Sequence, residues 1–192
     1  MTLRVLLLDD DVSRAQLVIK SLRGAGYEVV AHITGVEDLL SMVRKTGADL
    51  IVIDRDSPDR DTIEHVCVMT RDDPKPVVLF TDDPDQGKIR EAVAAGVSAY
   101  VVGGLSPERI RPIVDVALAR FEETRTLRQE LDQARSNLSE RKLIERAKGI
   151  VMKLRRVDEQ EAYSMLRTMA MERNQRLAVT AENVIAMAKL LG

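Results

Sequence analysis

The sequence is poor in the residue types that build disulfides, metal clusters and aromatic binding surfaces. It has a single cysteine, Cys67, no tryptophan and two histidines, His32 and His65, which lie in unrelated segments. One cysteine excludes both an intramolecular disulfide and a cysteine-type zinc site, and the two histidines do not have the spacing of metal ligands. Aromatic residues make up 3% of the chain, which argues against the stacking sheets of many single-strand-binding domains. We therefore expect any bound nucleic acid to be contacted by helices.

Long apolar runs are also absent from the sequence. No segment approaches the roughly 20 apolar residues that a membrane helix requires. The opening MTLRVLLLDDD places three carboxylates where a secretory signal peptide would need its cleavage site. These features predict a cytoplasmic protein that has no membrane partner.

Charge is distributed unevenly along the 192 residues, although the net charge is only −2. Residues 1–120 hold 15 Lys and Arg against 20 Asp and Glu, whereas residues 121–192 hold 14 against 11. Within residues 141–176 the counts are ten basic and five acidic. Such a local basic excess suits a polyanionic partner. The length fits one domain of about 120 residues followed by a smaller appendage.

Five short apolar runs alternate with longer amphipathic stretches between residues 4 and 101. The runs are RVLLL, EVVA, LIVID, PVVLF and AYVV, which are too short for helices and rich in β-branched residues. The helical patterns between them end at glycine or proline. This alternation predicts an α/β fold with a doubly wound, parallel, five-stranded sheet covered on both faces.

Polar side chains follow the carboxyl ends of these strands, where doubly wound sheets carry their sites. Aspartates at positions 9 to 11 follow the first strand, Asp54 follows the third, Thr81 ends the fourth and Tyr100 lies in the fifth. Clustered carboxylates repel one another unless a cation neutralises them. A hard divalent ion, Mg²⁺ first, is the expected occupant.

One long helix is predicted from Pro107 onward, because no glycine occurs again until Gly149. Residues at alternating spacings of three and four form a heptad seam along it, strongest from Leu127 to Leu138. The seam consists of Ile110, Ile113, Ala117, Arg120, Thr124, Leu127, Leu131, Ala134 and Leu138. We expect residues 106–138 to be a coiled-coil connector that forms a homodimer. The alternative is that its first part packs on the sheet and the remainder is a monomeric amphipathic helix.

A small three-helix unit is predicted beyond the connector. The first helix continues to about Arg156, Asp158 caps a second helix that runs to Met171, and a third runs from about Thr180 to Leu191. Basic side chains of the first two helices are the candidate RNA-binding residues: Arg141, Lys142, Arg146, Lys148, Lys153, Arg167 and Arg173. Those on the first helix are expected to share one broad, free face, because residues three and four apart are neighbours. The alternative is a merely solvated helix face.

Residues 1–120 resemble the receiver domain of bacterial two-component response regulators, the CheY-like fold. The match rests on the acidic pair Asp9 and Asp10, on Asp54 in DRDSPD, on Thr81 in LFTDD and on Tyr100 in AYVV. The resemblance implies that Asp54 accepts a phosphoryl group and that Mg²⁺ is held by Asp9, Asp10 and Asp54. It also implies that Thr81 and Tyr100 act as switch residues.

One position departs from the receiver pattern. Receivers carry a lysine at the end of the fifth strand that pairs with the phosphoryl oxygens, and Gly103 and Gly104 stand there in this sequence. An aspartyl phosphate would lose a charge-assisted partner worth about 1.5 to 3 kcal/mol. We therefore expect Asp54 to hold a phosphoryl group poorly. A working phosphoacceptor and a vestigial acidic cluster both remain open.

Residues 139–192 resemble the ANTAR module of transcription antiterminators, with AKGIVM and EAYSMLR as the most distinctive segments. This resemblance implies binding to paired stem-loops in nascent mRNA leaders. FTDDPD, GVSAYVVGGL, VDVALARFE and ERAKGIVMK are similar to the NasT type of nitrate and nitrite assimilation regulators. In that type a nitrate-sensing partner, NasS, holds the antiterminator inactive.

The expected function is thus that of a regulator and not of an enzyme. Two other classes stay open: a phosphorylation-controlled signalling adaptor and a DNA-binding response regulator. The latter would need a helix-turn-helix or winged helix, and neither is recognisable in the sequence.

Overall fold

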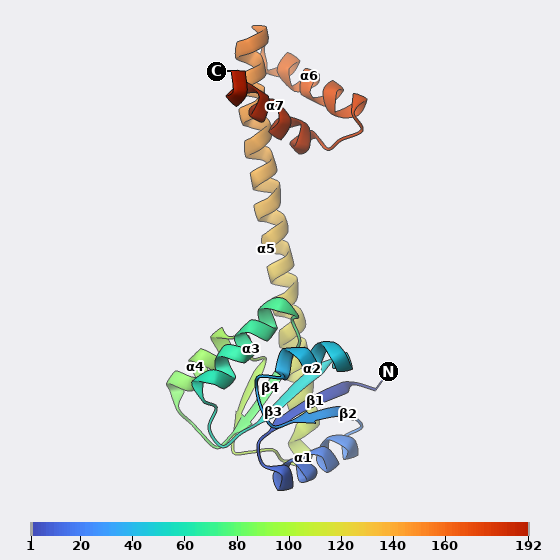
Figure 1. The fold of residues 1–192 in the computed structure, drawn as a ribbon, viewed down its shortest axis with the longest axis vertical. Coiled ribbons are helices and arrows are strands. Elements are labelled where there is room, and N and C mark those ends of the chain that lie inside the picture. The colour runs from blue at the N-terminus through green and yellow to red at the C-terminus, as the bar shows by residue number, and fades with distance from the viewer. Residues whose placement is uncertain (1, 192) are drawn as a thin grey trace. The chain divides into compact units, whose positions relative to one another are not determined.

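The computed structural model describes residues 2–191 and divides the chain into two compact units (Figure 1). The first unit ends at Arg125 and the second begins at Thr126. The first is built around a β-sheet, and the second is helical. Within residues 2–191 no helix is both long enough and apolar enough to cross a membrane.

The sheet of the first unit has five strands, all paired in parallel. The strands are β1 (Arg4–Asp9), β2 (Glu28–Ile33), β3 (Leu50–Asp54), β4 (Val77–Thr81) and β5 (Ala99–Val102). Their spatial order is β2-β1-β3-β4-β5. Every residue of β3 and β4 is buried, as expected for parallel strands covered on both faces. The predicted CheY-like, doubly wound sheet is confirmed.

Helices cover both faces of this sheet. They are α1 (Val12–Gly24), α2 (Leu39–Thr46), α3 (Arg60–Asp72), α4 (Gln86–Ala94) and the beginning of α5 (Pro107–Arg155). Alternate residues of β1 enter different cores: Leu6 and Leu8 pack with α2, α3 and α4, whereas Val5 and Leu7 pack with α1 and α5. The two-residue side-chain period of a strand therefore divides the apolar residues between two layers.

The beginning of α5 belongs to the core of the first unit. Ile110, Val114 and Ala117 are fully buried there against β-strands and α1. This corrects the expectation that the heptad seam serves a dimer along its whole length, because its first part packs on the sheet. Farther along, the side chains of Leu127 and Leu131 are 59% and 49% exposed, so only the later part of the seam is available to a partner.

The second unit is formed by the remainder of α5 together with α6 (Glu159–Glu172) and α7 (Leu177–Leu191). Its core contains mainly small and branched side chains: Ala147, Val151, Ala162, Leu166, Ala181 and Ile185. Arg156 and Asn174 adopt positive φ angles at the two helix connections. The three predicted helices are confirmed, although α7 begins at Leu177 and not at Thr180.

Candidate functional site

Parallel pairing brings the predicted acidic residues to one edge of the sheet. In the β1–β3 register Asp9 lies directly opposite Asp54. Asp9 is fully buried and Asp54 is 5% exposed, whereas Asp10 is exposed. The third aspartate, Asp11, is used differently: its carboxylate accepts hydrogen bonds from the first backbone amides of α1, a standard N-cap. The acidic pocket is therefore made by Asp9, Asp10 and Asp54.

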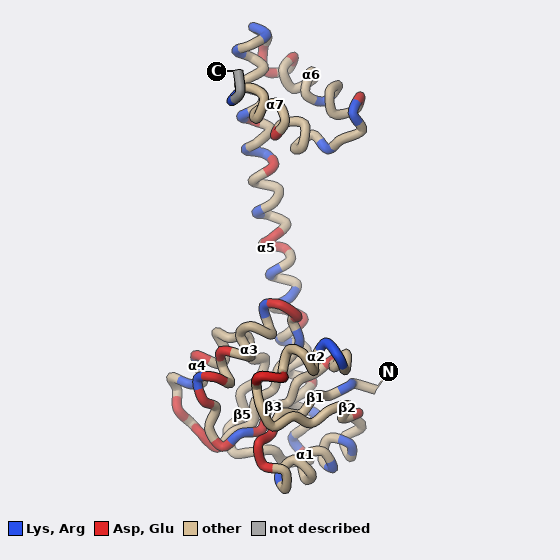
Figure 2. Tube along the Cα trace, viewed as in Figure 1, with Lys and Arg blue, Asp and Glu red and all other residues tan. Residues whose placement is uncertain are grey.

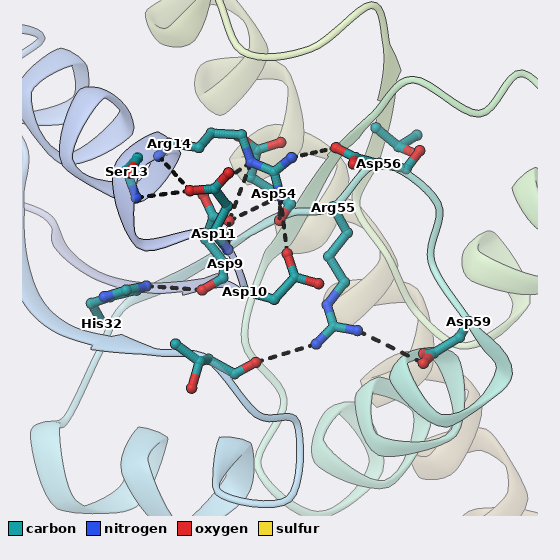
Figure 3. A network of polar contacts seen from close by, with 12 residues as sticks. Asp9, Asp10, Asp11, Ser13, Arg14, His32, Asp54, Arg55, Asp56 and Asp59 are labelled. Carbon is teal, nitrogen blue, oxygen red and sulfur yellow. Dashed lines mark hydrogen bonds and ion pairs between the residues drawn. The ribbon is translucent and has the colours of Figure 1, made fainter.

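An arginine that the sequence reasoning missed lies in the middle of this pocket (Figure 3). Nη2 of Arg14 is 2.9 Å from Oδ1 of Asp9 and 3.1 Å from Oδ1 of Asp10. Nε of Arg14 is 3.8 Å from Oδ2 of Asp54, and Nη1 pairs with Asp56. A basic residue four positions after Asp10, in the first turn of the following helix, is the signal that could have identified it.

The arrangement of these side chains does not fit the expected Mg²⁺ site. The guanidinium donors of Arg14 occupy carboxylate oxygens of both Asp9 and Asp10, and those oxygens would be the metal ligands. Among residues 2–191 no group of three or more His, Cys, Asp or Glu side chains is placed to hold a metal ion. The carboxylates converge as predicted, but their neutralising cation is a side chain.

Asp54 is the carboxylate whose ionisation is most disturbed. Burial raises its pKa from 3.8 to about 6, and repulsion from Asp9 and other nearby carboxylates acts in the same direction. The positive charge of Arg14 opposes the increase. Hydrogen bonding to Asp9 in turn raises the pKa of Arg14, so the guanidinium stays protonated. A buried carboxylate of this kind is typical of a functional site.

The two predicted switch residues are both tied to loops at the same edge of the sheet. The hydroxyl of Thr81 donates to the backbone oxygen of Asp56 at 2.8 Å and accepts from the Asp83 amide at 3.1 Å. The hydroxyl of Tyr100 donates to the backbone oxygen of Asp83 at 3.1 Å. Lys88, which was not predicted, binds the Asp83 carboxylate at 2.7 Å and lowers its pKa to about 2. Asp83 thus connects both switch positions to α4.

The two glycines at the end of β5 have backbone angles that a lysine would adopt only with strain. Gly103 and Gly104 have φ angles of 95° and 68°, in the region that glycine alone adopts without cost. A Cβ atom at Gly103 would meet no atom within 4 Å, so backbone conformation and not space disfavours other residues. A cavity of about 180 Å³ lies here beside Asp54, bounded also by Thr81, Gly104 and Leu105.

Basic residues of the second unit, blue along the trace in Figure 2, are the other candidate site. All of the predicted RNA-binding residues except one are exposed: Arg141, Lys142, Arg146 and Lys153 on α5, Arg167 on α6, and Arg173 at the C-cap of α6. Two further arginines of the same basic cluster, Arg155 at the end of α5 and Arg156 directly after it, are also exposed. We call these eight residues the basic surface.

Lys148 is the exception, and the prediction that it lies on the free face was wrong. Its side chain is buried, and Nζ binds Glu145 at 2.8 Å and Glu159 at 2.6 Å. The hydrogen bond that Nζ donates to Glu145, followed by the one it donates to Glu159, raises the pKa of Lys148. Helical spacing alone placed Lys148 beside Arg141, but the packing of α6 on α5 covers it and brings Glu159 to its ammonium. Lys148 therefore joins two helices of the unit.

The raised pKa of Asp54 predicts a pH-dependent gain in stability for Asp54→Asn. Because the folded state holds the proton more tightly than the unfolded state, the parent loses stability as pH rises from about 4 to about 6. The variant has no such loss. We expect it to match the parent below about pH 4 and to exceed it above pH 6 by about 1 to 3 kcal/mol, measured by urea unfolding.

A matched control for this experiment is Asp61→Asn, at an exposed aspartate on α3. It should change the unfolding free energy by less than about 0.5 kcal/mol across the same pH range. A constant difference between Asp54→Asn and the parent at all pH values would contradict the assignment of Asp54 as a buried carboxylate with a raised pKa.

Comparison with known proteins extends over both units. The response regulator receiver domain model matches residues 5–115, and the ANTAR domain model matches residues 132–185. The chain is 28% identical over 182 residues to the transcriptional regulatory protein PdtaR of Mycobacterium tuberculosis, a match that covers 95% of this chain and 89% of PdtaR. The DNA-binding response regulator MtrA of Mycolicibacterium smegmatis is 29% identical over 120 residues, covering 62% of this chain and 52% of MtrA.

Solved structures match the first unit. The chemotaxis protein CheY4 of Vibrio cholerae superposes with a TM-score of 0.53 at 24% identity, covering 60% of this chain and 98% of CheY4. A LuxR-family response regulator from Aurantimonas sp. SI85-9A1 superposes with a TM-score of 0.55 at 26% identity, covering 62% of this chain and 86% of that one. The sheet order, the acidic strand ends and the receiver match over more than half of the sequence lead to one assignment. This chain belongs to the response regulator receiver domain family, carries an ANTAR domain after the receiver, and is a regulatory protein and not an enzyme.

Proposed function

We propose that this chain is a transcription antiterminator that binds paired stem-loops in nascent mRNA leaders through its ANTAR domain. The observation that carries the proposal is the basic surface, which lies on helices of the unit that the ANTAR model matches. Phosphates dominate affinity for nucleic acids and are neutralised by Lys and Arg. The splayed bases of a hairpin loop are accessible to helices, whereas the deep A-form major groove is not.

Similarity to DNA-binding regulators does not favour the DNA-binding alternative. The match to MtrA extends over 120 residues and 62% of this chain, about the extent of the receiver. A match of receiver length gives no support for DNA binding by the ANTAR-matched residues 132–185. A tail that served only as a protein adaptor would not need eight exposed basic side chains in and directly beside two helices.

Arg146→Gln is the variant that tests RNA binding most directly. Arg146 is exposed, and the core of its unit is formed by other residues, so the variant should fold and melt as the parent does. Each lost phosphate contact should lower the slope of log affinity against log salt by about 0.7 to 0.9. We expect weaker binding at every salt concentration, measured by mobility shift with a stem-loop RNA that the parent selects from a random-loop library.

Arg90→Gln in the receiver removes the same charge from an exposed position on α4 and should bind as the parent does. Lys148→Gln should instead lower the melting temperature, because it breaks the contacts with Glu145 and Glu159. Equal affinity and equal salt dependence for the parent and Arg146→Gln would contradict the assigned surface. Tighter binding to duplex DNA than to the selected RNA would contradict the function.

We propose further that the exposed part of α5 forms a coiled-coil homodimer. Thr124, Leu127, Leu131, Ala134 and Leu138 continue the three-four spacing beyond the receiver core, and all five side chains are exposed. Leucines at such positions pack into a facing helix in coiled coils. Exposed apolar side chains in a continuous seam mark an interaction surface, and a second copy of the chain would bury them.

Leu131→Lys should convert the dimer into a monomer, because it places a charge in the middle of the seam at a side chain that is 49% exposed in the single chain. Sedimentation equilibrium of the full chain measures the mass. Gln129→Lys, two residues away and outside the three-four pattern, should leave the dimer intact. A parent that sediments as a monomer, or an unchanged mass for Leu131→Lys, would refute the seam.

Control by a nitrate-sensing, NasS-like partner completes the proposal, with nitrate and nitrite assimilation genes as the targets. Two features of the receiver support control by a protein in place of phosphorylation. Glycines stand where the phosphoryl-binding lysine is expected, with positive φ angles, and Arg14 already binds the carboxylates of the pocket. A bound partner can block the ANTAR domain without any change at Asp54.

The purified chain should co-elute in gel filtration with the nitrate-binding regulatory protein of the same organism, and nitrate should separate the two. Asp54→Asn should behave like the parent in this assay and should retain antitermination in cells. Loss of antitermination in Asp54→Asn would restore phosphorylation as the controlling event. Failure to co-elute would remove the partner but not the RNA-binding function.

A further inference from the structure

Arg14 is the basic residue of the acidic pocket, and the sequence patterns did not predict a role for it. Its guanidinium contacts carboxylates from two strand ends and the loop that follows β3: Asp9, Asp10, Asp54 and Asp56. Nη2 also donates to the backbone oxygen of Asp54 at 3.3 Å. A guanidinium has five donors in a fixed planar arrangement and is always charged. It can therefore satisfy several carboxylates at once (Figure 3).

The local fold holds Arg14 in this position. Arg14 is the third residue of α1, and its backbone amide donates to the Asp11 carboxylate that caps the helix. The cap sets the direction of the first helical turn immediately after β1. The side chain is 27% exposed, so most of it is enclosed by the pocket. A group tethered in this way acts at a high effective concentration and loses little further freedom when it binds.

We infer that Arg14 is a built-in cation that takes the place of the divalent metal ion in this receiver, so that the acidic pocket is neutralised without Mg²⁺. A divalent ion would have to displace donors from Asp9 and Asp10 and remain within a few ångströms of a second positive charge. Mg²⁺ dehydrates reluctantly and demands regular octahedral geometry. Metal binding is therefore disfavoured in this pocket by competition for the same oxygens and by charge repulsion.

Removal of the arginine side chain tests this inference on the full chain. Binding of Mn²⁺ alone is followed by the loss of its free-ion EPR signal, and Mg²⁺ is then added as competitor. We expect Arg14→Ala to bind one Mn²⁺ with an affinity at least about tenfold higher than that of the parent. Mg²⁺ should raise the melting temperature of Arg14→Ala and leave that of the parent unchanged.

Arg60→Ala is the matched control, because Arg60 is 89% exposed, lies on α3 and pairs only with Glu64 among the described residues. It removes the same charge without opening the pocket and should bind Mn²⁺ no better than the parent. Adding Asp54→Asn to Arg14→Ala should abolish the new affinity, since it removes one of the carboxylate ligands.

Several outcomes would overturn the inference. One is a parent that binds Mn²⁺ as tightly as Arg14→Ala; another is a folded Arg14→Ala that binds no better than the parent. If Arg14→Ala is unfolded by circular dichroism, Mg²⁺ should restore its helix content, and failure to do so would also refute the exchange of one cation for another. Because the readout is metal binding by the receiver, it stands apart from RNA binding by the ANTAR domain.

Discussion

The parallel pairing of β1 with β3 brings two buried carboxylates together, and the stability of the first unit depends on the neutralisation of their charge. The register sets Asp9 directly opposite Asp54, and both are almost fully buried. Neighbouring buried carboxylates destabilise the fold unless a positive charge neutralises them. Arg14 supplies that charge from the first turn of α1, so sheet register, helix cap and pocket charge form one connected arrangement.

The surrounding contacts tie the same edge of the sheet to the neighbouring loops. Thr81 and Tyr100 both hydrogen-bond at Asp83, which Lys88 holds from α4. Gly104, after β5, lines a cavity that also borders Asp54. A receiver whose carboxylates are already paired, and whose phosphoryl-binding lysine is replaced by glycine, is well suited to control by a protein partner, in accordance with the proposed function.

In the second unit, some basic side chains form ion pairs within the unit, and others are exposed and available to a ligand. Lys148 is buried and binds Glu145 and Glu159 across α5 and α6. Arg176 similarly pairs with Glu140. The basic surface remains exposed on the same helices, so substitutions there alter charge without removing core contacts. This separation makes the RNA-binding proposal testable by single substitutions.

The sequence by itself determined the order of strands and helices, the three helices of the second unit and the convergence of Asp9 with Asp54. Side-chain periodicity reports which face of an element is apolar, and parallel strands gather their carboxyl ends at one edge. Only the tertiary structure decided what each charged or apolar face meets. Arg14 looked like an ordinary helix residue, Lys148 like a free cation and Ile110 like part of a dimer seam. Arg14 pairs with Asp54, Lys148 with Glu159, and Ile110 packs in the receiver core, so each partner comes from another segment of the chain. Helical spacing carries no information about such contacts, because they are made by packing between elements.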